Sequence, residues 1–324
     1  MIKLDSDIFK ESSKSLTEHS LPGHLIRFIV VFIVIMLLES IIPSLIAVPK
    51  MIAELDVQGL IQDNGKISMN DSVQVAMGVS AASGVMIPSL FSTIFGTLTS
   101  IIYCRVAEVR NFRSMGVKKK GFFLHYGAGI LFGTVLMSSI VLLSVLTGIN
   151  SIAVSKELDM KIFLLYFAGW IIQGMSEEFI FRGYLMTTIG GHYNKWLAVG
   201  ISSVAFALAH IMNPGISVLA FIDLTIYGLF AALYMVYTEN IWGCCAIHSF
   251  WNFLQGNFYG ISVSGTAASN SVFVTTSKTS HAFLSGGGFG IEGSLLTTLI
   301  LGAGCIILCL LISRKEKAAA PENS

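Results

Sequence analysis

Three short polar groupings could do chemistry together in this otherwise apolar chain. The first contains Glu177, Glu178 and Arg182. Glu178 and Arg182 are four residues apart, so on a helix they share one face and can form an ion pair. Glu177 is rotated from Glu178 by about 100° on a helix of 3.6 residues per turn, which leaves it without that partner. A carboxylate in such a site suits a general base. The alternative is a buried ion-pair cluster that only fixes helix packing.

A histidine occupies the next apolar segment. His210 follows Phe206 by four residues, so the two side chains share a helix face. The turn at residues 190–195 joins this segment to the preceding one as an antiparallel hairpin. At 1.5 Å per residue, Glu177 and His210 both lie roughly 20 Å from that turn. We therefore expect them to face each other, although a single histidine here could also be a hydrogen-bonded packing residue.

The third grouping places an imidazole and a carboxamide one helical turn apart. His248 and Asn252 can donate two converging hydrogen bonds, as an oxyanion hole for acyl transfer requires. The alternative is that they join helices as satisfied polar residues. His248 lies only ~10 Å from the predicted start of its helix, a depth that does not match that of His210. Either the hairpin projects past the headgroups into the cytoplasm, or residues 213–215 end the fifth span below the outer surface.

Two further acidic residues interrupt apolar segments. Ionisable residues in a membrane span are costly and indicate a function or a buried partner. Glu39 and Asp223 have no matching constellation around them. We interpret each as a buried hydrogen-bonding residue or as part of a cavity lining.

The composition indicates that membrane helices position these residues. Of 324 residues, 54% are hydrophobic and 12% are charged, against roughly 25% charged in a soluble domain. Apolar stretches of about 20 residues, the length that crosses a ~30 Å hydrocarbon layer, recur along the chain. The sequence therefore predicts an all-α fold, a polytopic transmembrane helical bundle with about eight spans. The predicted spans are residues 25–48, 75–104, 121–147, 162–188, 196–212, 217–237, 241–261 and 291–313.

The distribution of cations predicts the orientation. Most of the 20 Lys and Arg residues fall in the segments that are cytoplasmic if the amino terminus is inside, as cytoplasmic loops require. We expect a cytoplasmic segment 1–24, a single transmembrane domain 25–313 and a cytoplasmic tail 314–324. The cationic loop 105–120 fits ordinary topology determination, with a lipid-headgroup or substrate site as the alternative. The Gly- and Ser-rich residues 262–290 suggest a flexible outer loop.

Charge and cysteine content exclude several other classes of protein. The formal net charge of +1 gives no electrostatic footprint for nucleic acid, so we expect no nucleic-acid partner. The five cysteines have neither zinc nor redox spacing and are interpreted as packing residues. The expected partners are the lipid bilayer and the substrate or ligand of the three polar groupings.

Together, Glu-Glu-x-x-x-Arg, Phe-x-x-x-His and His-x-x-x-Asn, in this order on three spans, resemble the signature of the CPBP family. That family comprises CAAX prenyl endopeptidases, bacterial relatives linked to bacteriocin processing and self-immunity, and proteins labelled Abi. The likeness covers about residues 160–261. A Trp-Gly segment after Ile241 adds to it.

The resemblance implies an intramembrane glutamic endopeptidase that needs no cofactor. The implied catalytic-site residues are Glu177, Glu178, Arg182, His210, His248 and Asn252. The first glutamate and the first histidine would activate the attacking water, the third motif would stabilise the oxyanion, and the Glu-Arg pair would hold the first motif in shape. The family picture implies a water-filled cavity open to the cytoplasm. The implied substrate is a short peptide or a membrane-tethered precursor, prenylated or bacteriocin-like, cut near the cytoplasmic face of a cell membrane.

Other functions remain open. Glu177, His210 and His248 could supply three ligands of an open catalytic zinc site, although no His-Glu-x-x-His helix is present. A transporter could use the buried carboxylates and histidines to relay protons, but we find no repeat of the kind that transporters contain. A scaffold or immunity protein could bind a membrane partner and cut nothing.

Overall fold

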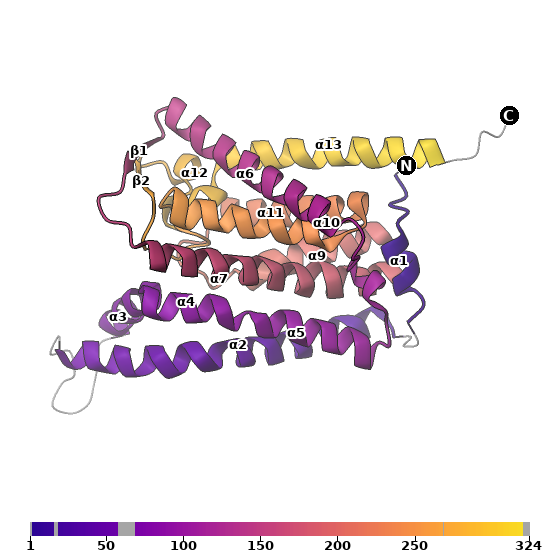
Figure 1. Ribbon diagram of the computed structural model, residues 1–324, viewed down its shortest axis with the longest axis horizontal. Coiled ribbons are helices and arrows are strands. Elements are labelled where there is room, and N and C mark those ends of the chain that lie inside the picture. Colours follow the sequence, from indigo (N-terminus) through magenta and orange to yellow (C-terminus); the bar gives the residue numbers. More distant parts are fainter. Residues whose placement is uncertain (1, 16–18, 58–68, 268, 320–324) are drawn as a thin grey trace.

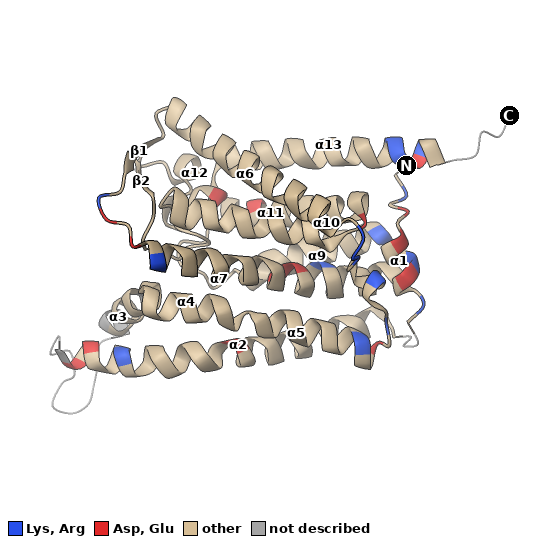
Figure 2. Cartoon of the chain, viewed as in Figure 1, with Lys and Arg blue, Asp and Glu red and all other residues tan. Residues whose placement is uncertain are grey.

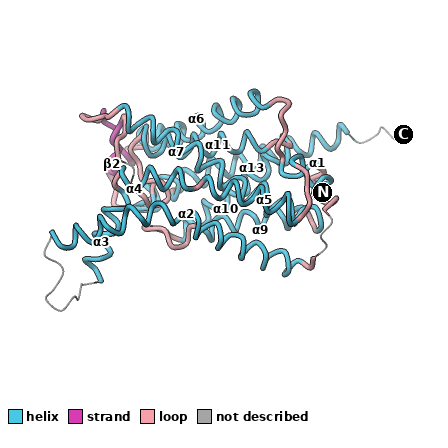
Figure 3. The backbone as a smooth tube through the Cα atoms, turned by 60° about the horizontal axis from the view of Figure 1, so that its bottom comes forward, coloured by secondary structure: helices cyan, strands magenta, loops and turns pink. Residues whose placement is uncertain are grey.

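The structure, a computed structural model, describes residues 2–15, 19–57, 69–267 and 269–319. It is mostly helical, and the long helices run lengthwise along the molecule (Figures 1 and 3). In chain order the elements are α1 (Asp7–Ser12), α2 (Leu21–Val57), α3 (Met69–Ala81), α4 (Ser83–Ser92), α5 (Ile94–Ile102), η1 (Tyr103–Ala107), η2 (Phe112–Met115), α6 (Phe122–Leu146), β1 (Asn150–Val154), α7 (Met160–Glu178), η3 (Phe179–Met186), α8 (Thr187–His192), α9 (Lys195–Ala209), α10 (Val218–Thr238), α11 (Ile241–Phe253), η4 (Leu254–Phe258), β2 (Phe273–Ser277), α12 (Ala282–Ser285), η5 (Gly287–Phe289), η6 (Ile291–Gly293) and α13 (Leu295–Ala319).

Several helices have the length and hydropathy of membrane spans. Among the described residues, five segments are long and apolar enough to cross a bilayer: Leu21–Asp56, Ser83–Ala107, Phe122–Leu146, Val218–Thr238 and Leu295–Ala319. The chain is therefore a multi-pass membrane protein. Helix α9 has 15 residues, about 22 Å, less than the ~30 Å of the hydrocarbon layer. The helix in the predicted span 196–212 thus ends at Ala209, three residues before the predicted end.

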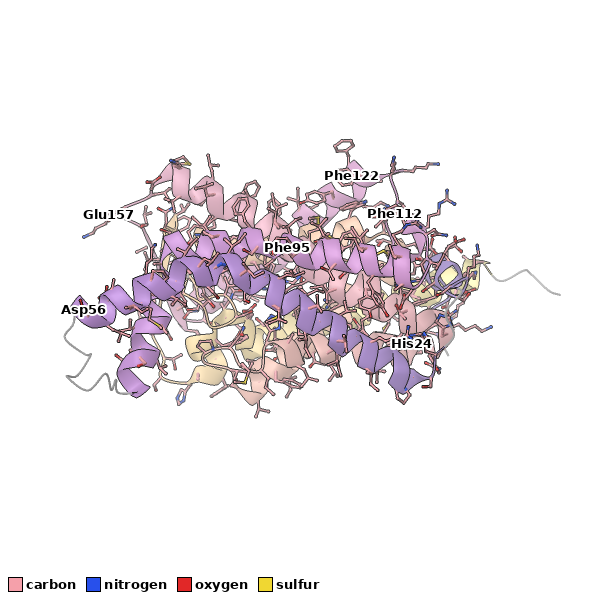
Figure 4. The ribbon with its side chains drawn as sticks, turned by 90° about the horizontal axis from the view of Figure 1, so that it is seen from below. His24, Asp56, Phe95, Phe112, Phe122 and Glu157 are labelled. Carbon is pink, nitrogen blue, oxygen red and sulfur yellow. The ribbon has the colours of Figure 1, made fainter. Side chains whose placement is uncertain are left out.

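The charged side chains separate the two ends of the molecule. Lys and Arg gather at the end where α1 and the last turn of α13 lie (Figure 2), which we term the basic end. Figure 4 labels His24, Phe112 and Phe122 at this end, and Asp56 and Glu157 at the opposite end. The described parts nearest the two termini thus lie at the same end of the molecule.

The amino-terminal segment packs against the basic end. Ile8 and Phe9 of α1 are buried, and a Cβ on Gly190 would meet the Phe9 ring at 2.2 Å. Apolar burial of this kind stabilises by roughly 1.5–3 kcal/mol for each large side chain. The end of α8 is therefore covered by protein and not by lipid.

The opposite end corrects two predictions. Strands β1 and β2 pair antiparallel, with Asn150 opposite Ser277 and Val154 opposite Phe273, so the fold is mostly helical and not all-α. Both strands contain β-branched residues, which suit a pleated surface. The predicted flexible loop 262–290 contains β2, α12 and η5, and Phe289 is fully buried. Its Gly and Ser residues permit tight turns. A Gly- and Ser-rich composition is the same for a segment with tight turns as for a flexible loop, so it did not distinguish them.

Helix α11 occupies the centre of the bundle. It packs against both α6 and α7. At Gly174 of α7 an added Cβ would lie 2.6 Å from the amide nitrogen of Ser249, so a larger residue there would force the helices apart. Helix α10 packs against α9 and α13. These contacts bring the ends of α7 and α9 beside the middle of α11.

Candidate active site

Glu177, the residue before the last of α7, lies at the centre of a polar cluster. Its Oε1 accepts a hydrogen bond from Gln173 Nε2 at 2.6 Å. Its Oε2 lies 3.4 Å from His248 Nε2 and 4.0 Å from His210 Nε2. The expectation that Glu177 and His210 face each other is confirmed, because helix rise set both at similar depths. One carboxylate oxygen therefore faces two imidazoles from two other helices.

Glu178 has two partners where the sequence predicted one. Its Oε1 accepts from Arg182 Nη1 at 3.2 Å, as expected, and also contacts His248 Nδ1 at 2.8 Å. Glu178 and Arg182 are fully buried. A carboxylate at Nδ1 fixes the ring orientation and leaves Nε2 free for chemistry. The π-helix η3 begins at Phe179, and π-helical turns are frequent at functional sites.

His210 caps the carboxyl end of α9. Its Nδ1 lies 2.8 Å from the carbonyl oxygen of Phe206, so Nε2 points toward Glu177. The Arg182 guanidinium in turn stacks over the Phe206 ring, with its carbon 4.6 Å from the ring centre. The four-residue spacing of Phe206 and His210 thus joins the second motif to the first.

Two features of the helix ends bear on the depth mismatch. Helix α9 stops at Ala209, and α10 starts only at Val218, so residues 210–217 lie outside both helices. At the basic end, α8 extends onto α1, where Gly191 lies against Ser12. His248 can therefore be near the start of α11 and still reach Glu177.

Asn252 joins the cluster through an intermediary. Its Nδ2 donates to Gln173 Oε1 at 2.8 Å, and Gln173 donates to Glu177. The predicted pair of His248 and Asn252 lines the same cavity. The six predicted residues are thus gathered in one region: four line the cavity, and the buried pair Glu178 and Arg182 lies behind them.

A cavity of about 210 Å³ connects these side chains. Its lining includes Val263, Ser264 and Thr266 from the segment between η4 and β2. Asn213 Nδ2 donates to the Ser264 carbonyl at 2.9 Å, and Gly265, with φ of 84°, lies so near Pro214 that a Cβ would clash. Irregular backbone at membrane depth is tolerated where it lines a cavity. Irregular backbone of residues 213–215 and 263–266 therefore borders the cavity.

Sequence reasoning missed Gln173 and Glu292 in the cavity wall. Gln173 precedes Glu177 by four residues, a spacing that could have indicated contact. Glu292 stands at the start of the predicted last span and was not recognised as a buried carboxylate. Asp223 lines this cavity, as expected of it. Glu39 lines an adjacent cavity that also touches Glu177 and His210.

The same side chains were the candidates for a metal site. In the described ranges, no three His, Cys, Asp or Glu residues are arranged to hold a metal ion. Glu177 Oε2 faces the two imidazoles of His210 and His248. This arrangement can move protons between Glu177 and a bound water.

Comparison with protein families gives one match, over residues 159–254. The matching family model is named Rce1-like, and its description is type II CAAX prenyl endopeptidase Rce1-like. No curated protein and no solved structure matches the chain. The family match confirms the resemblance drawn from the three motifs, and its bounds enclose every residue of those motifs.

Proposed function

Because residues 159–254 form a domain of the Rce1-like type II CAAX prenyl endopeptidase family, a family of proteases, we propose that the chain is an intramembrane endopeptidase with Glu177 as its base. One observation carries the proposal. Glu177, His210 and His248 come from three separate helices and face one another in a cavity of about 210 Å³. A packing cluster would fill such a space with side chains.

In the proposed reaction Glu177 takes a proton from water while the water oxygen attacks the carbonyl carbon. His210 Nε2, on the other side of the same carboxylate oxygen, helps to orient the water. The carbon–nitrogen bond then breaks, and the proton held by Glu177 passes to the leaving amine. Proton transfer by a positioned side chain accelerates such steps by about 10²–10⁴-fold.

The negative charge that develops on the carbonyl oxygen needs donors. The Glu178 carboxylate holds His248 by Nδ1 and thereby directs Nε2 into the cavity, where it can serve as the first donor. Asn252, placed by Gln173, supplies the second donor. Removing one such donor typically costs about 10²–10³-fold in rate.

The proposed substrate is a short peptide or a membrane-tethered precursor, including prenylated or bacteriocin-like ones. The family description supports peptide-bond hydrolysis, and the position of the site within the bundle supports a membrane-bound substrate. We place the chain in the cell membrane with its basic end in the cytoplasm. A cysteine introduced at the exposed Lys119 should then react with an impermeant thiol reagent only after cells are opened.

The test compares cells that carry the wild-type chain, Glu177→Gln or Glu157→Gln. The control removes the same charge at an exposed position between β1 and α7. Proteomics of membrane-associated peptides should show an uncut precursor accumulating with Glu177→Gln alone. If the precursors are identical in all three strains, the protease proposal is wrong, and a scaffold that keeps its binding would explain the result.

The metal-dependent alternative is tested in the same assay. Membranes treated with a chelator should retain cleavage of the precursor. Loss of cleavage on chelation, restored by added zinc, would replace the glutamate-activated mechanism.

A further inference from the structure

A second acidic region lies in the cavity that contains Glu177. Asp223 of α10 and Glu292 of η6 both line this cavity. Among the described residues that line it, none is Lys or Arg. Three carboxyl groups therefore share one small space without a Lys or Arg, and only Glu292 of the pair Asp223 and Glu292 interacts electrostatically with the cavity-lining His210.

Asp223 leaves one oxygen unused. Its Oδ1 accepts a hydrogen bond from Thr298 Oγ1 at 2.5 Å. Its Oδ2 is buried and has no hydrogen-bond partner in the described part of the chain, while the residue as a whole is 1% exposed. A buried polar atom without a partner costs about 1–3 kcal/mol, and such atoms are rare in native structures. The open oxygen therefore indicates a missing partner.

Glu292 is held in place by contrast. The amide and hydroxyl of Ser264 donate to its Oε1, and Trp251 Nε1 donates to its Oε2 at 3.4 Å. Asp223 and Glu292 also interact electrostatically. Glu292 is thus held by three donors, and Asp223 retains a free acceptor oxygen.

We propose that Asp223 and Glu292 form a subsite for a cationic group of the peptide that is cut at Glu177, a Lys or Arg side chain or a free amino terminus. An ammonium or guanidinium would supply the hydrogen bond that Asp223 Oδ2 lacks. Its single positive charge would balance one carboxylate charge, and charge-assisted bonds of this kind are about twice as strong as neutral ones. The inference rests on the proposed function, because the bound group belongs to the substrate.

The alternative role of Asp223 is structural, since its bond to Thr298 joins α10 to α13. A structural role affects all substrates equally. A cation subsite affects substrates according to their charge. The two roles are therefore separated by the ratio of rates for charged and neutral peptides.

The experiment uses the purified full-length chain in proteoliposomes and a set of fluorogenic peptides. The peptides differ only in Lys against norleucine at each position beside the cut, each with a free or an acetylated amino terminus. For the wild type we expect kcat/KM at least ~10-fold higher for a peptide with a Lys side chain or a free amine at one defined position. Asp223→Asn should bring this ratio close to one, and Asp223→Glu should restore part of it. Asp56→Asn, at an exposed position, should keep the wild-type ratio.

Equal kcat/KM for Lys and norleucine peptides overturns the subsite, as does an equal loss for both with Asp223→Asn. Where turnover is too slow to measure, the affinity of the Glu177→Gln variant for the same peptides is measured by fluorescence anisotropy. This measurement then tests the subsite. Equal affinity for charged and neutral peptides there also overturns it. A charge preference in binding, with no cleavage by the wild type, keeps the subsite and ends the protease proposal instead.

Discussion

The molecule contains two buried arginine clusters, and they differ in how completely their polar atoms are satisfied. Arg110, at the basic end, lies 2.7 Å from Glu108 through its Nε. Its two terminal nitrogens donate to four more side chains: Ser12, Thr187, Thr188 and Cys104. This cluster ties the amino-terminal helix α1 to α8 and to the chain after α5.

Arg182, in the middle of the bundle, has one ion-pair partner and one aromatic ring in contact with its guanidinium. It donates to Glu178 and stacks on Phe206. In the described ranges, Arg182 Nε and Nη2 and Glu178 Oε2 have no hydrogen-bond partner. At the basic end both terminal nitrogens of Arg110 have hydrogen-bond partners and its Nε has only the ion pair with Glu108, an arrangement that suits helix packing. In the central cluster one terminal nitrogen of Arg182 has no hydrogen-bond partner among the described residues. Incomplete satisfaction thus separates a site for chemistry from a structural ion pair.

The largest effect is expected when the glutamate of each cluster is replaced by glutamine, and the two variants test this comparison. Glu178→Gln and Glu108→Gln each leave a buried arginine without its countercharge, so each should destabilise by about 3–5 kcal/mol. Glu178→Gln should also lower the kcat of the folded protein by ~10²-fold, because His248 loses its carboxylate. Glu108→Gln should leave that kcat within about twofold.

Thermal unfolding in detergent and precursor cleavage at a fixed amount of folded protein provide the two measurements. Equal losses of kcat in the two variants would show that both clusters are structural. A Glu178→Gln protein with normal kcat would remove Glu178 from the proposed mechanism.

The site was predictable from sequence where it depends on one helix or one hairpin. The Glu178–Arg182 pair follows from a four-residue spacing, and the approach of Glu177 to His210 follows from helix rise on two arms of equal length. These relations need no knowledge of how distant helices are rotated. The overall class, a helical membrane bundle, likewise follows from long apolar segments.

The other contacts of the site depend on how distant helices are rotated and at what depth they lie, and the sequences of the connecting loops do not specify either. The contact of His248 with Glu178 joins segments 70 residues apart in the chain. Glu292 reaches the cavity because residues 262–293 fold back into the bundle, which a Gly- and Ser-rich composition does not reveal. Strand β1 pairs with a strand more than a hundred residues later in the chain, and no local pattern identifies such a partner.

A smaller effect is expected at Gln173, which connects Glu177 to Asn252. Gln173→Leu removes both hydrogen bonds, each of about 1 kcal/mol, and frees both side chains. We expect kcat to fall by ~10-fold with little change in KM. Gln74→Leu, at an exposed position near the opposite end, is the matched control. A change in KM alone would mean that Gln173 binds substrate and does not position Glu177.

The smallest effect is expected at an ion pair on the periphery of the basic end. Glu239, just after α10, is partly buried, which opposes ionisation, but it accepts bonds from the Asp7 amide and from Lys118 at 3.1 Å. These bonds hold the pKa of Glu239 below its ordinary value of 4.5. A carboxyl group with a depressed pKa stabilises the fold above the unfolded value, and this contribution is lost as the pH falls through the folded value.

Glu239→Gln should therefore lower the free energy of unfolding by under ~1 kcal/mol near neutral pH. The difference from the wild type should shrink as the pH is lowered past the ordinary pKa of 4.5. Cleavage at neutral pH should not change, because Glu239 contacts α1 and Lys118 and no residue of the cavity. A difference that grows in acid would mean that the pair opposes folding, and the ion pair of Glu239 with Lys118 would then not contribute to the stability of the basic end.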